Sequence, residues 1–251
     1  MKDADKNMSR ILRRVGGNDF LLMLDFDGVL APIVARPNMA RIGKRTRALL
    51  AACARRGRVA VISGRALADV RTRVGLSDIW YAGNHGAEWQ MGKARGREKL
   101  SRALGTKLRE AREAFAELSR GYRGVVVEDK VLTFSVHFRA LARPHSARFR
   151  KDAERVAKKF AHFLDISEGA EYIFNIRPRA GRTKGDAVRL ARKSASAKAV
   201  PIYIGDDTTD EDAFLALKGG ITIRVGKSAS SAAEYYFKTR ASVDKFLRNL
   251  A

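Results

Sequence analysis

Apolar residues along this chain follow two different rhythms. Short unbroken apolar runs, such as FLLML at 20–24, RVAVI at 58–62 and PIYIG at 201–205, are typical of buried strands. Elsewhere apolar residues recur every three or four positions, as in ALADVRTRV at 66–74 and TKGDAVRLARKSA at 183–195, which predicts amphipathic helices. This alternation predicts a parallel sheet with helices on its faces, built from both ends of the chain.

The middle of the chain has a different order of elements. From about residue 107 to 182 the pattern predicts a helix, two strands, a second helix at 145–164 and a further strand, EYIFNIRP at 171–178. This order predicts an α+β module with its helices on one face of a mostly antiparallel sheet. We therefore expect an α/β fold in which residues 1–106 and 183–251 form the core and residues 107–182 form an inserted domain.

The composition is that of a folded protein without a membrane segment. Of the 251 residues, 45% are hydrophobic, which is enough for a packed interior. The first residues, MKDADKNMSRILRR, lack the apolar segment of a secretory signal, and no later segment has the roughly 18 unbroken apolar residues of a membrane helix. The single Cys53 cannot form an internal disulfide. We expect a soluble cytoplasmic protein with no membrane partner.

The charge of the chain is strongly positive. Fifty Lys and Arg residues against 27 Asp and Glu residues give a formal net charge of +23. The basic residues are spread along the chain, which favours solvated helix faces over a dedicated nucleic-acid surface, so no specific nucleic acid is expected. The field could still help to capture a phosphorylated substrate.

Two carboxylates follow the first strand-like run. Asp25 and Asp27 lie one residue apart, and Gly28 after them allows a tight backbone turn close to a ligand. Ligands of open parallel sheets bind outside the carboxyl ends of the strands, where these residues are expected. So close a pair repels itself unless a cation lies between the two groups or one of them holds a proton. The alternative is that they cap a turn at the exit of the strand.

Two further places at the same expected edge could bind an anion. Ser63 and Gly64 lie between a strand and a helix, whose first amides could face an anion, although Ser63 could equally be a plain N-cap. Arg65 is a candidate contact to phosphate or to sugar hydroxyls. Lys184 falls in the first turn of a helix that Thr183 or a neighbour begins, where the dipole disfavours a cation unless a negative group compensates it. A solvated lysine is the alternative.

A second acidic pair follows the late strand. Asp206 and Asp207 come directly after PIYIG, and Thr209 with Asp212 in the next helix resembles a capping box. The box does not cover Asp206 and Asp207, which are the kind of carboxylate pair that Mg2+ would use. Clustered carboxylates, an anion-binding helix start and a lysine are the parts that phosphoryl transfer needs.

With these motifs in place, the chain resembles the haloacid-dehalogenase-like phosphatases, and within them the trehalose-6-phosphate phosphatase family. LDFDGVLAPI, VISGR, YAGNHGAE, VEDK, SVHFR, IRP with TKG, and IGDDTTDEDAF carry the resemblance. It implies a Rossmann-like parallel-sheet core with an inserted α+β cap domain that closes over the sugar. It also implies that Asp25 is the nucleophile, that Asp27 is the acid and base, and that Ser63 and Lys184 hold the phosphoryl group.

The resemblance implies a cofactor and substrate contacts as well. Mg2+ would be bound by Asp25, by the backbone carbonyl of Asp27 and by Asp206, with Asp207 and Asp210 orienting the ligands. Substrate contacts implied or suggested by position are Gly28, Gly64, Arg65, His85, Glu88, Glu128, Lys130 and Asn175. Of these, Glu128 and Lys130 would contact the distal sugar, and His85 and Glu88 would lie where the core meets the cap.

One residue departs from the family pattern: Asn175 stands where many relatives have a glutamate. We expect a monomeric enzyme that hydrolyses trehalose 6-phosphate with Mg2+ through an aspartyl phosphate, in trehalose biosynthesis. Another sugar phosphate, such as sucrose 6-phosphate or mannosyl-3-phosphoglycerate, is the closest alternative substrate. From a different class, a basic nucleic-acid-binding protein with a vestigial phosphatase core would explain the charge.

Overall fold

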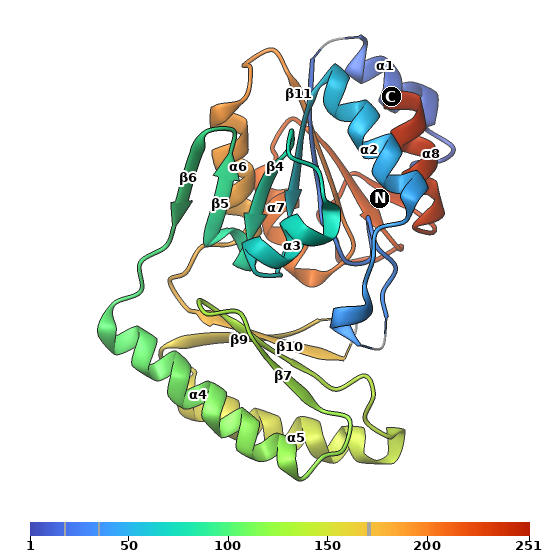
Figure 1. Ribbon diagram of the computed structural model, residues 1–251. Helices are drawn as coiled ribbons and strands as arrows, with labels where there is room; N and C mark the ends of the chain where they lie inside the picture. Colours follow the sequence, from blue (N-terminus) through green and yellow to red (C-terminus); the bar gives the residue numbers. More distant parts are fainter. Residues whose placement is uncertain (18, 35, 170–171) are drawn as a thin grey trace. The chain divides into compact units, whose positions relative to one another are not determined.

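The chain forms two compact units (Figure 1). The computed structural model describes residues 1–17, 19–34, 36–169 and 172–251. The larger unit, called the core unit, comprises Met1–Val34, Asn38–Arg97 and Arg182–Ala251. The smaller unit, called the cap unit, is formed chiefly by Glu98–Gly181. Helix α4, Arg102–Arg120, lies within the cap unit, so the boundary expected after residue 106 falls inside a helix.

A single sheet organises the core unit. Its strands are β1 Lys2–Asp3, β2 Phe20–Leu24, β3 Arg58–Ile62, β4 Trp80–Gly83, β5 Glu88–Met91, β6 Ala94–Arg97, β11 Val200–Gly205, β12 Ile221–Val225 and β13 Tyr235–Phe237. Within the described ranges their order is β1-β13-β12-β11-β2-β3-β4-β5-β6. In this sheet order, the strands from β1 through β13, β12, β11, β2 and β3 to β4 are all parallel to their neighbours, whereas β5 and β6 add an antiparallel hairpin at one edge.

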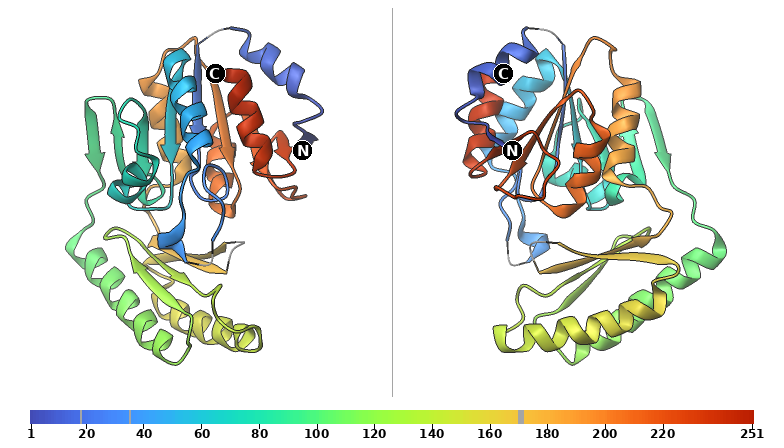
Figure 2. Two further views of the ribbon diagram at one scale, coloured as in Figure 1. Left: turned by 45° about the vertical axis from the view of Figure 1, so that its right-hand side comes forward. Right: turned by 180° about the vertical axis from the view of Figure 1, so that it is seen from behind.

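Helices cover both faces of this sheet (Figures 1 and 2). They are α1 Met8–Val15, α2 Lys44–Arg56, α3 Leu67–Val74, α6 Lys184–Ser194, α7 Glu211–Ala216 and α8 Ala241–Leu250, with 3-10 turns η1 Pro37–Met39, η2 Asn84–Gly86 and η3 Thr208–Asp210. Successive residues of β2 serve the two faces, because side chains alternate along a strand. Leu22 packs in one buried cluster with residues of α1, α2, α3 and α8, and Met23 packs in another with residues of α6 and α7.

The position of β2 sets the place of the functional groups. It pairs with β11 on one side and β3 on the other, and the chain continues outward from both. The strand order therefore reverses at β2, and such a switch point is where open α/β sheets bind ligands. Asp25, the residue after β2, donates its backbone N–H to Ile204 O at 2.9 Å, so its backbone is held at the end of β11.

The cap unit has its own sheet and core. Strands β7 Val126–Asp129, β8 Phe134–His137, β9 Leu164–Gly169 and β10 Ile173–Pro178 form an antiparallel sheet in the order β7-β8-β10-β9. Helices α4 and α5, the latter Arg143–Phe160, lie on one face of it (Figure 1). Phe134 and Phe174 of the sheet share a buried cluster with Phe115 of α4 and Phe149 of α5.

The predicted α/β class with an inserted α+β module is confirmed, and so is the strand EYIFNIRP over its residues Ile173–Pro178, whereas one local prediction in the cap unit was wrong. The helix expected at 145–164 ends at Phe160, because Leu164 already begins β9, a strand that the pattern did not reveal. The strand expected at 171–178 begins at Ile173, and Glu171 lies outside the described residues. Within the described ranges, no helix combines the length and apolar character needed to cross a membrane.

Candidate active site

Lys184 is the cation that links the two acidic segments of the core unit. It is the first residue of α6, after the N-cap Thr183, whose side chain forms a capping box with Asp186. The Lys184 side chain is 2% exposed, and its Nζ donates to Asp25 Oδ2 at 2.7 Å and to Asp210 Oδ1 at 2.8 Å. Although burial acts in the opposite direction, these two carboxylates raise the pKa of Lys184 above its usual value. The negative compensation expected for a lysine at this helix position is present.

Asp25 is held on both of its carboxylate oxygens. Oδ1 accepts from the backbone N–H of Phe26 at 2.6 Å, and Oδ2 accepts from Lys184. Burial raises the pKa of Asp25 to about 7, Lys184 opposes this rise, and the nearby Asp210 adds to it. A buried carboxylate that is fixed at the switch point of the sheet and paired with a lysine is suited to act as a nucleophile.

Asp210 binds several groups of this cluster through its carboxylate. Its Oδ1 accepts from Lys184 and from Tyr203 Oη at 2.6 Å, and its Oδ2 accepts from the backbone N–H groups of Asp206 and Asp207 at 2.9 Å each. Four donors thus occupy a side chain that is 0% exposed. The predicted capping box between Thr209 and Asp212 was wrong: Asp207 is the N-cap of η3 and pairs with Asp210, so Asp207 does belong to a cap.

Three carboxylates lie close enough to share a metal ion. Oxygens of Asp25, Asp206 and Asp210 lie within 4.8 Å of one another. Burial, together with Asp25 and Asp210, raises the pKa of Asp206 well above its usual value, which is the signature of crowded carboxylates that a cation would relieve. The donor set, all oxygen, fits Mg2+. Asp25 and Asp206 are suited to bind the metal ion directly. Each oxygen of Asp210 already accepts two hydrogen bonds. Asp207 is not one of the three clustered carboxylates.

Gly28 leaves room for the Asp206 carboxylate. Its φ is +75°, and a Cβ added there would lie 1.9 Å from Asp206 Oδ2. A side chain at residue 28 would therefore displace Asp206, as well as strain the backbone. Gly28 was expected to let a ligand approach the backbone. The structure instead places the Asp206 carboxylate there.

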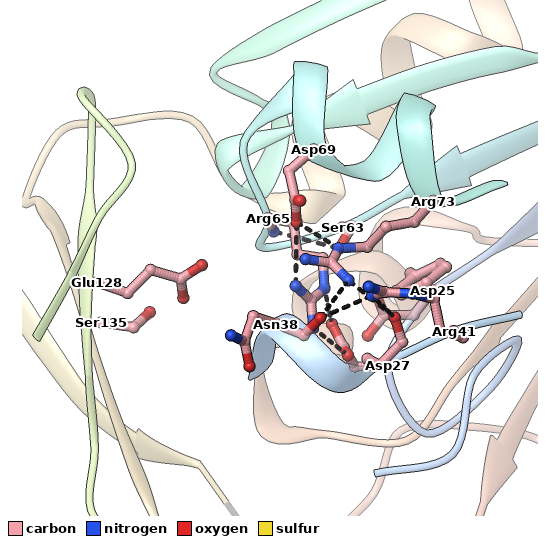
Figure 3. Close-up of polar contacts among 12 residues, drawn as sticks. Asp25, Asp27, Asn38, Arg41, Ser63, Arg65, Asp69, Arg73, Glu128 and Ser135 are labelled. Atoms are coloured by element: carbon pink, nitrogen blue, oxygen red, sulfur yellow. Dashed lines mark hydrogen bonds and ion pairs between the residues drawn. The ribbon is translucent and has the colours of Figure 1, made fainter. Parts of the chain in front are cut away.

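The Arg65 guanidinium does not point to an open phosphate site. Its Nε donates to Asp27 Oδ2 at 2.7 Å, its Nη2 donates to Asp27 Oδ1 at 2.8 Å, and its Nη1 donates to Asp69 Oδ2 at 3.0 Å. Although burial opposes it, the bonds to Asp27 and Asp69 raise the pKa of Arg65. The sequence suggested a contact to phosphate or sugar; the contact found here is an ion pair with the predicted acid, Asp27 (Figure 3).

Ser63 lies at the end of β3 and is 1% exposed. Its backbone N–H donates to Ala82 O at 2.9 Å, and its Oγ accepts from the backbone N–H of Arg65 at 3.2 Å. The alternative of a plain N-cap was wrong, because α3 begins at Leu67 with Ala66 as its N-cap. Ser63 is therefore a hydroxyl buried in the loop that follows β3.

The loop of η2 supports the loop that follows β3. Asn84 and His85 have positive φ, and the backbone N–H of His85 donates to Ser63 O at 3.0 Å. A Cβ at Gly64 would lie 2.6 Å from the His85 ring, so the glycine is needed for this close packing. Glu88 Oε2 accepts from the first N–H of α3, at 3.2 Å, and from Asn84 Nδ2, at 2.8 Å. The start of α3, where an anion was expected to bind, is thus contacted by the carboxylate of Glu88. The expected substrate contacts of His85 and Glu88 stay predictions.

The cap unit carries a row of polar residues on the sheet face opposite its helices. Register places Glu128, Ser135, Asn175 and Ser167 side by side across the four strands. Ser135 Oγ donates to Asn175 Oδ1 at 3.0 Å and accepts from Lys130 Nζ at 2.6 Å, and His137 Nε2 lies 2.9 Å from Glu128 Oε2. Glu128, Lys130 and Asn175 were predicted from the sequence and Ser135 was not, although its place in the alternation of SVHFR was an available signal.

Comparisons with known proteins agree on one family. The trehalose-phosphatase family model matches residues 23–242. Trehalose-phosphate phosphatase of Mycobacterium avium (strain 104) is 35% identical in an alignment 226 residues long, which covers 88% of this chain and 57% of that protein. Probable trehalose-phosphate phosphatase 4 of Oryza sativa subsp. japonica is 31% identical in an alignment 258 residues long, gaps included, which covers 98% of this chain and 70% of that protein.

A solved structure supports the fold. The C-terminal domain of the C. albicans trehalose-6-phosphate phosphatase superposes with a TM-score of 0.86 at 19% identity and covers 97% of this chain and 96% of that chain. The chain spans a little over half the length of the mycobacterial relative. The family model covers most of the chain, and the rice relative is matched over most of its own length. The chain belongs to the trehalose-phosphatase family.

Proposed function

We propose that this chain is a Mg2+-dependent phosphatase that hydrolyses trehalose 6-phosphate to trehalose and phosphate through an aspartyl phosphate, as a step of trehalose biosynthesis. The observation that carries the proposal is the environment of Asp25: a buried carboxylate that Lys184 holds at 2.7 Å beside Asp206. Membership of the family supports the substrate, because the relatives that match the chain are named trehalose-phosphate phosphatases.

The proposed roles of Asp25 and Lys184 are supported by their mutual contact, and those of Ser63 and Asp27 by the resemblance to the family. The Asp25 carboxylate attacks phosphorus, and Lys184, which already donates to Asp25, neutralises charge on the phosphoryl oxygens. Ser63 donates its hydroxyl to the same group. Asp27, whose side chain is 40% exposed, gives a proton to the sugar oxygen and later takes one from water.

The proposed Mg2+ site consists of Asp25, Asp206 and the backbone carbonyl of Asp27, with Asp207 and Asp210 orienting these ligands. Bound there, the ion would neutralise the crowded carboxylates and polarise a phosphoryl oxygen. Asp210 supports this role because its four donors fix the backbone of Asp206 and the ammonium of Lys184.

The polar row of the cap unit is the proposed sugar-binding surface. Lys130 and Asn175 are 5% and 7% exposed and are joined through Ser135, so their polar groups are fixed before a sugar arrives. Asn175 can donate to and accept from hydroxyls but carries no charge, which keeps another sugar phosphate, such as sucrose 6-phosphate, as the second candidate substrate. We further propose that the enzyme acts as a cytoplasmic monomer, which sedimentation and cell fractionation would test.

Phosphate release from trehalose 6-phosphate, with Mg2+ and with chelator, tests the proposal. We expect release with Mg2+, loss of release with EDTA, and recovery when Mg2+ is added in excess. A panel with sucrose 6-phosphate and mannosyl-3-phosphoglycerate tests the sugar, and a clear preference for one of these would replace trehalose 6-phosphate. No release from any substrate, with nucleic-acid affinity that falls steeply with salt, would favour the nucleic-acid-binding alternative.

A further inference from the structure

Arg65 holds the proposed acid and base from its buried side. Arg65 is 5% exposed, and its guanidinium binds both oxygens of Asp27, through Nε at 2.7 Å and Nη2 at 2.8 Å. A two-bond fork of this kind fixes the plane of a carboxylate as well as its position. The Asp27 side chain, 40% exposed, is therefore a group that solvent or a ligand can reach but whose orientation Arg65 sets.

Arg65 is itself anchored on two other sides. Its Nη1 donates to Asp69 of α3 at 3.0 Å, and its guanidinium lies 5.4 Å from the centre of the buried Phe26 ring. Asp69 also accepts from Arg73 Nε at 2.7 Å, and Arg73 Nη1 donates to Ala40 O at 2.8 Å (Figure 3). A chain of alternating charges thus runs from Asp27 into α3 and the segment before α2, and each member limits the movement of the next.

The bonding of Arg65 decides between a substrate contact and an indirect role. Its Nε, Nη1 and Nη2 atoms each donate to a carboxylate, and two of these three bonds go to the two oxygens of Asp27, which favours the indirect role. The ion pair joins the loop after β2 to the loop after β3, which carry Asp27 and Ser63. Its place is therefore between functional loops and not at the surface of the fold.

We propose that Arg65 is a positioning residue that acts through Asp27, holding its carboxyl in one place and plane for proton transfer to the leaving sugar oxygen. The inference rests on the proposed phosphatase function. In that step a bond forms from Asp25 to phosphorus, the bond from phosphorus to the sugar oxygen breaks, and the proton of Asp27 passes to that oxygen. Asp69 and Arg73 keep Arg65 in place.

The role of a positioned acid depends on the leaving group. A sugar alkoxide needs a proton as it departs, whereas p-nitrophenolate leaves readily without one. The ratio kcat/KM reports events up to the first irreversible step, which here is formation of the aspartyl phosphate. Loss of Asp27 positioning should therefore lower kcat/KM for trehalose 6-phosphate and leave kcat/KM for p-nitrophenyl phosphate nearly unchanged.

The experiment measures kcat/KM of Arg65→Lys on both substrates with Mg2+. Lysine keeps the charge but loses the fork, so we expect about a 10- to 100-fold loss on trehalose 6-phosphate and less than about a 3-fold loss on p-nitrophenyl phosphate. Asp69→Asn, which leaves Arg65 and Asp27 in place, should give a smaller loss with the same substrate dependence. Arg71→Lys is the matched control, because Arg71 is an exposed arginine on α3, the helix that carries Asp69. Its kcat/KM should equal that of the unmodified chain on both substrates.

Equal losses on both substrates would overturn the inference, because they would show a general structural role for Arg65. A faster Arg65→Lys variant would also overturn it, since the ion pair would then restrain Asp27. Should Arg65→Lys fail to fold, Asp69→Asn decides by the same criterion. Failure of the proposed function has a different signature, because the unmodified chain would then release no phosphate from trehalose 6-phosphate, whether or not it hydrolyses p-nitrophenyl phosphate.

Discussion

The polar cluster of the core unit and the polar row of the cap unit are built by different means. In the core unit, four segments far apart in sequence meet, and Asp25, Lys184 and Asp210 are tied by charged hydrogen bonds with little exposure to water. In the cap unit, the register of one antiparallel sheet lines up Glu128, Ser135 and Asn175, and a neutral hydroxyl joins its members.

This difference separates chemistry from recognition. A change in the core cluster removes a charge partner from a buried group, which should damage stability and turnover together. A change in the cap row removes one neutral bond from a sheet whose hydrophobic side is intact, which should alter the choice of substrate and little else.

Asp25→Asn should abolish turnover, by about 10³-fold or more, because the amide is not a nucleophile towards phosphorus. The fold should persist with a lower free energy of unfolding, because the amide has one oxygen where the carboxylate has two. It can accept from Lys184 or from the Phe26 N–H, which bind different oxygens of Asp25, but not from both. Phosphate release and circular dichroism measure the two effects. Turnover near that of the unmodified chain would exclude the covalent scheme and leave the core cluster without its proposed chemistry.

Asp210→Ala should lower the free energy of unfolding by about 3–5 kcal/mol, because it leaves the Lys184 ammonium and three other buried donors with one acceptor fewer. Urea denaturation measures this loss. Asp78→Ala, an exposed carboxylate on the same unit, is the control and should change the free energy by less than about 0.5 kcal/mol. Similar values for the two variants would contradict the supporting role of Asp210.

Mg2+ should stabilise the core unit, and more so at higher pH. Burial raises the pKa of Asp25 to about 7 and that of Asp206 well above its usual range, so the folded chain holds these protons more tightly than the unfolded chain. Without metal, the stability that the two groups contribute is present at low pH and declines as the pH rises from the ordinary aspartate pKa of 3.8 through about 7.

Thermal unfolding between pH 5 and 8 tests this linkage. At about 100 times its Kd, Mg2+ contributes roughly 2.7 kcal/mol, which corresponds to roughly 5–10 °C for a chain of this size. Because protons compete with the ion, the gain should shrink towards pH 5. A gain that is equal at every pH, or that survives in Asp206→Ala, would place the ion elsewhere.

Asn175→Ala should lower kcat/KM for trehalose 6-phosphate about 10-fold, through loss of a hydrogen bond to the sugar, and should leave p-nitrophenyl phosphate unaffected. Steady-state kinetics on the two substrates measure the effect. Arg148→Gln, on an exposed part of α5, is the control. An equal loss on both substrates would show that the cap row supports the chemistry, and the separation of the two regions would fail.

The strand ends of the core unit were predictable because hydrophobic pattern and chemistry agree there. FLLML and RVAVI fill the centre of the sheet, and the polar residues that follow them fall at its carboxyl edge. Lys184 was recognisable because a cation at a helix start conflicts with the local dipole. Its partners Asp25 and Asp210, 159 and 26 positions away, resolve that conflict.

The remaining contacts depend on tertiary structure. Thr209 with Asp212 and Asp207 with Asp210 both match the spacing of a capping box. Asp210 forms the observed box because its side chain also accepts from the buried donors Lys184 and Tyr203. The partner of Arg65 lies 38 residues away on another strand end, so no local pattern identifies it. Ser135 likewise gains its neighbours from register, which single strands do not specify.

The hairpin of β5 and β6 has a consequence for how copies of this protein behave in solution. β6, with the sequence ARGR, is the last strand of the core sheet in its observed order, and Lys93, Arg95 and Arg97 are exposed on it or next to it. An outer strand is a template on which a second sheet edge can add, and lysine and arginine on it repel an identical edge. Part of the +23 charge therefore opposes aggregation through this strand edge, and the repulsion weakens as salt screens it.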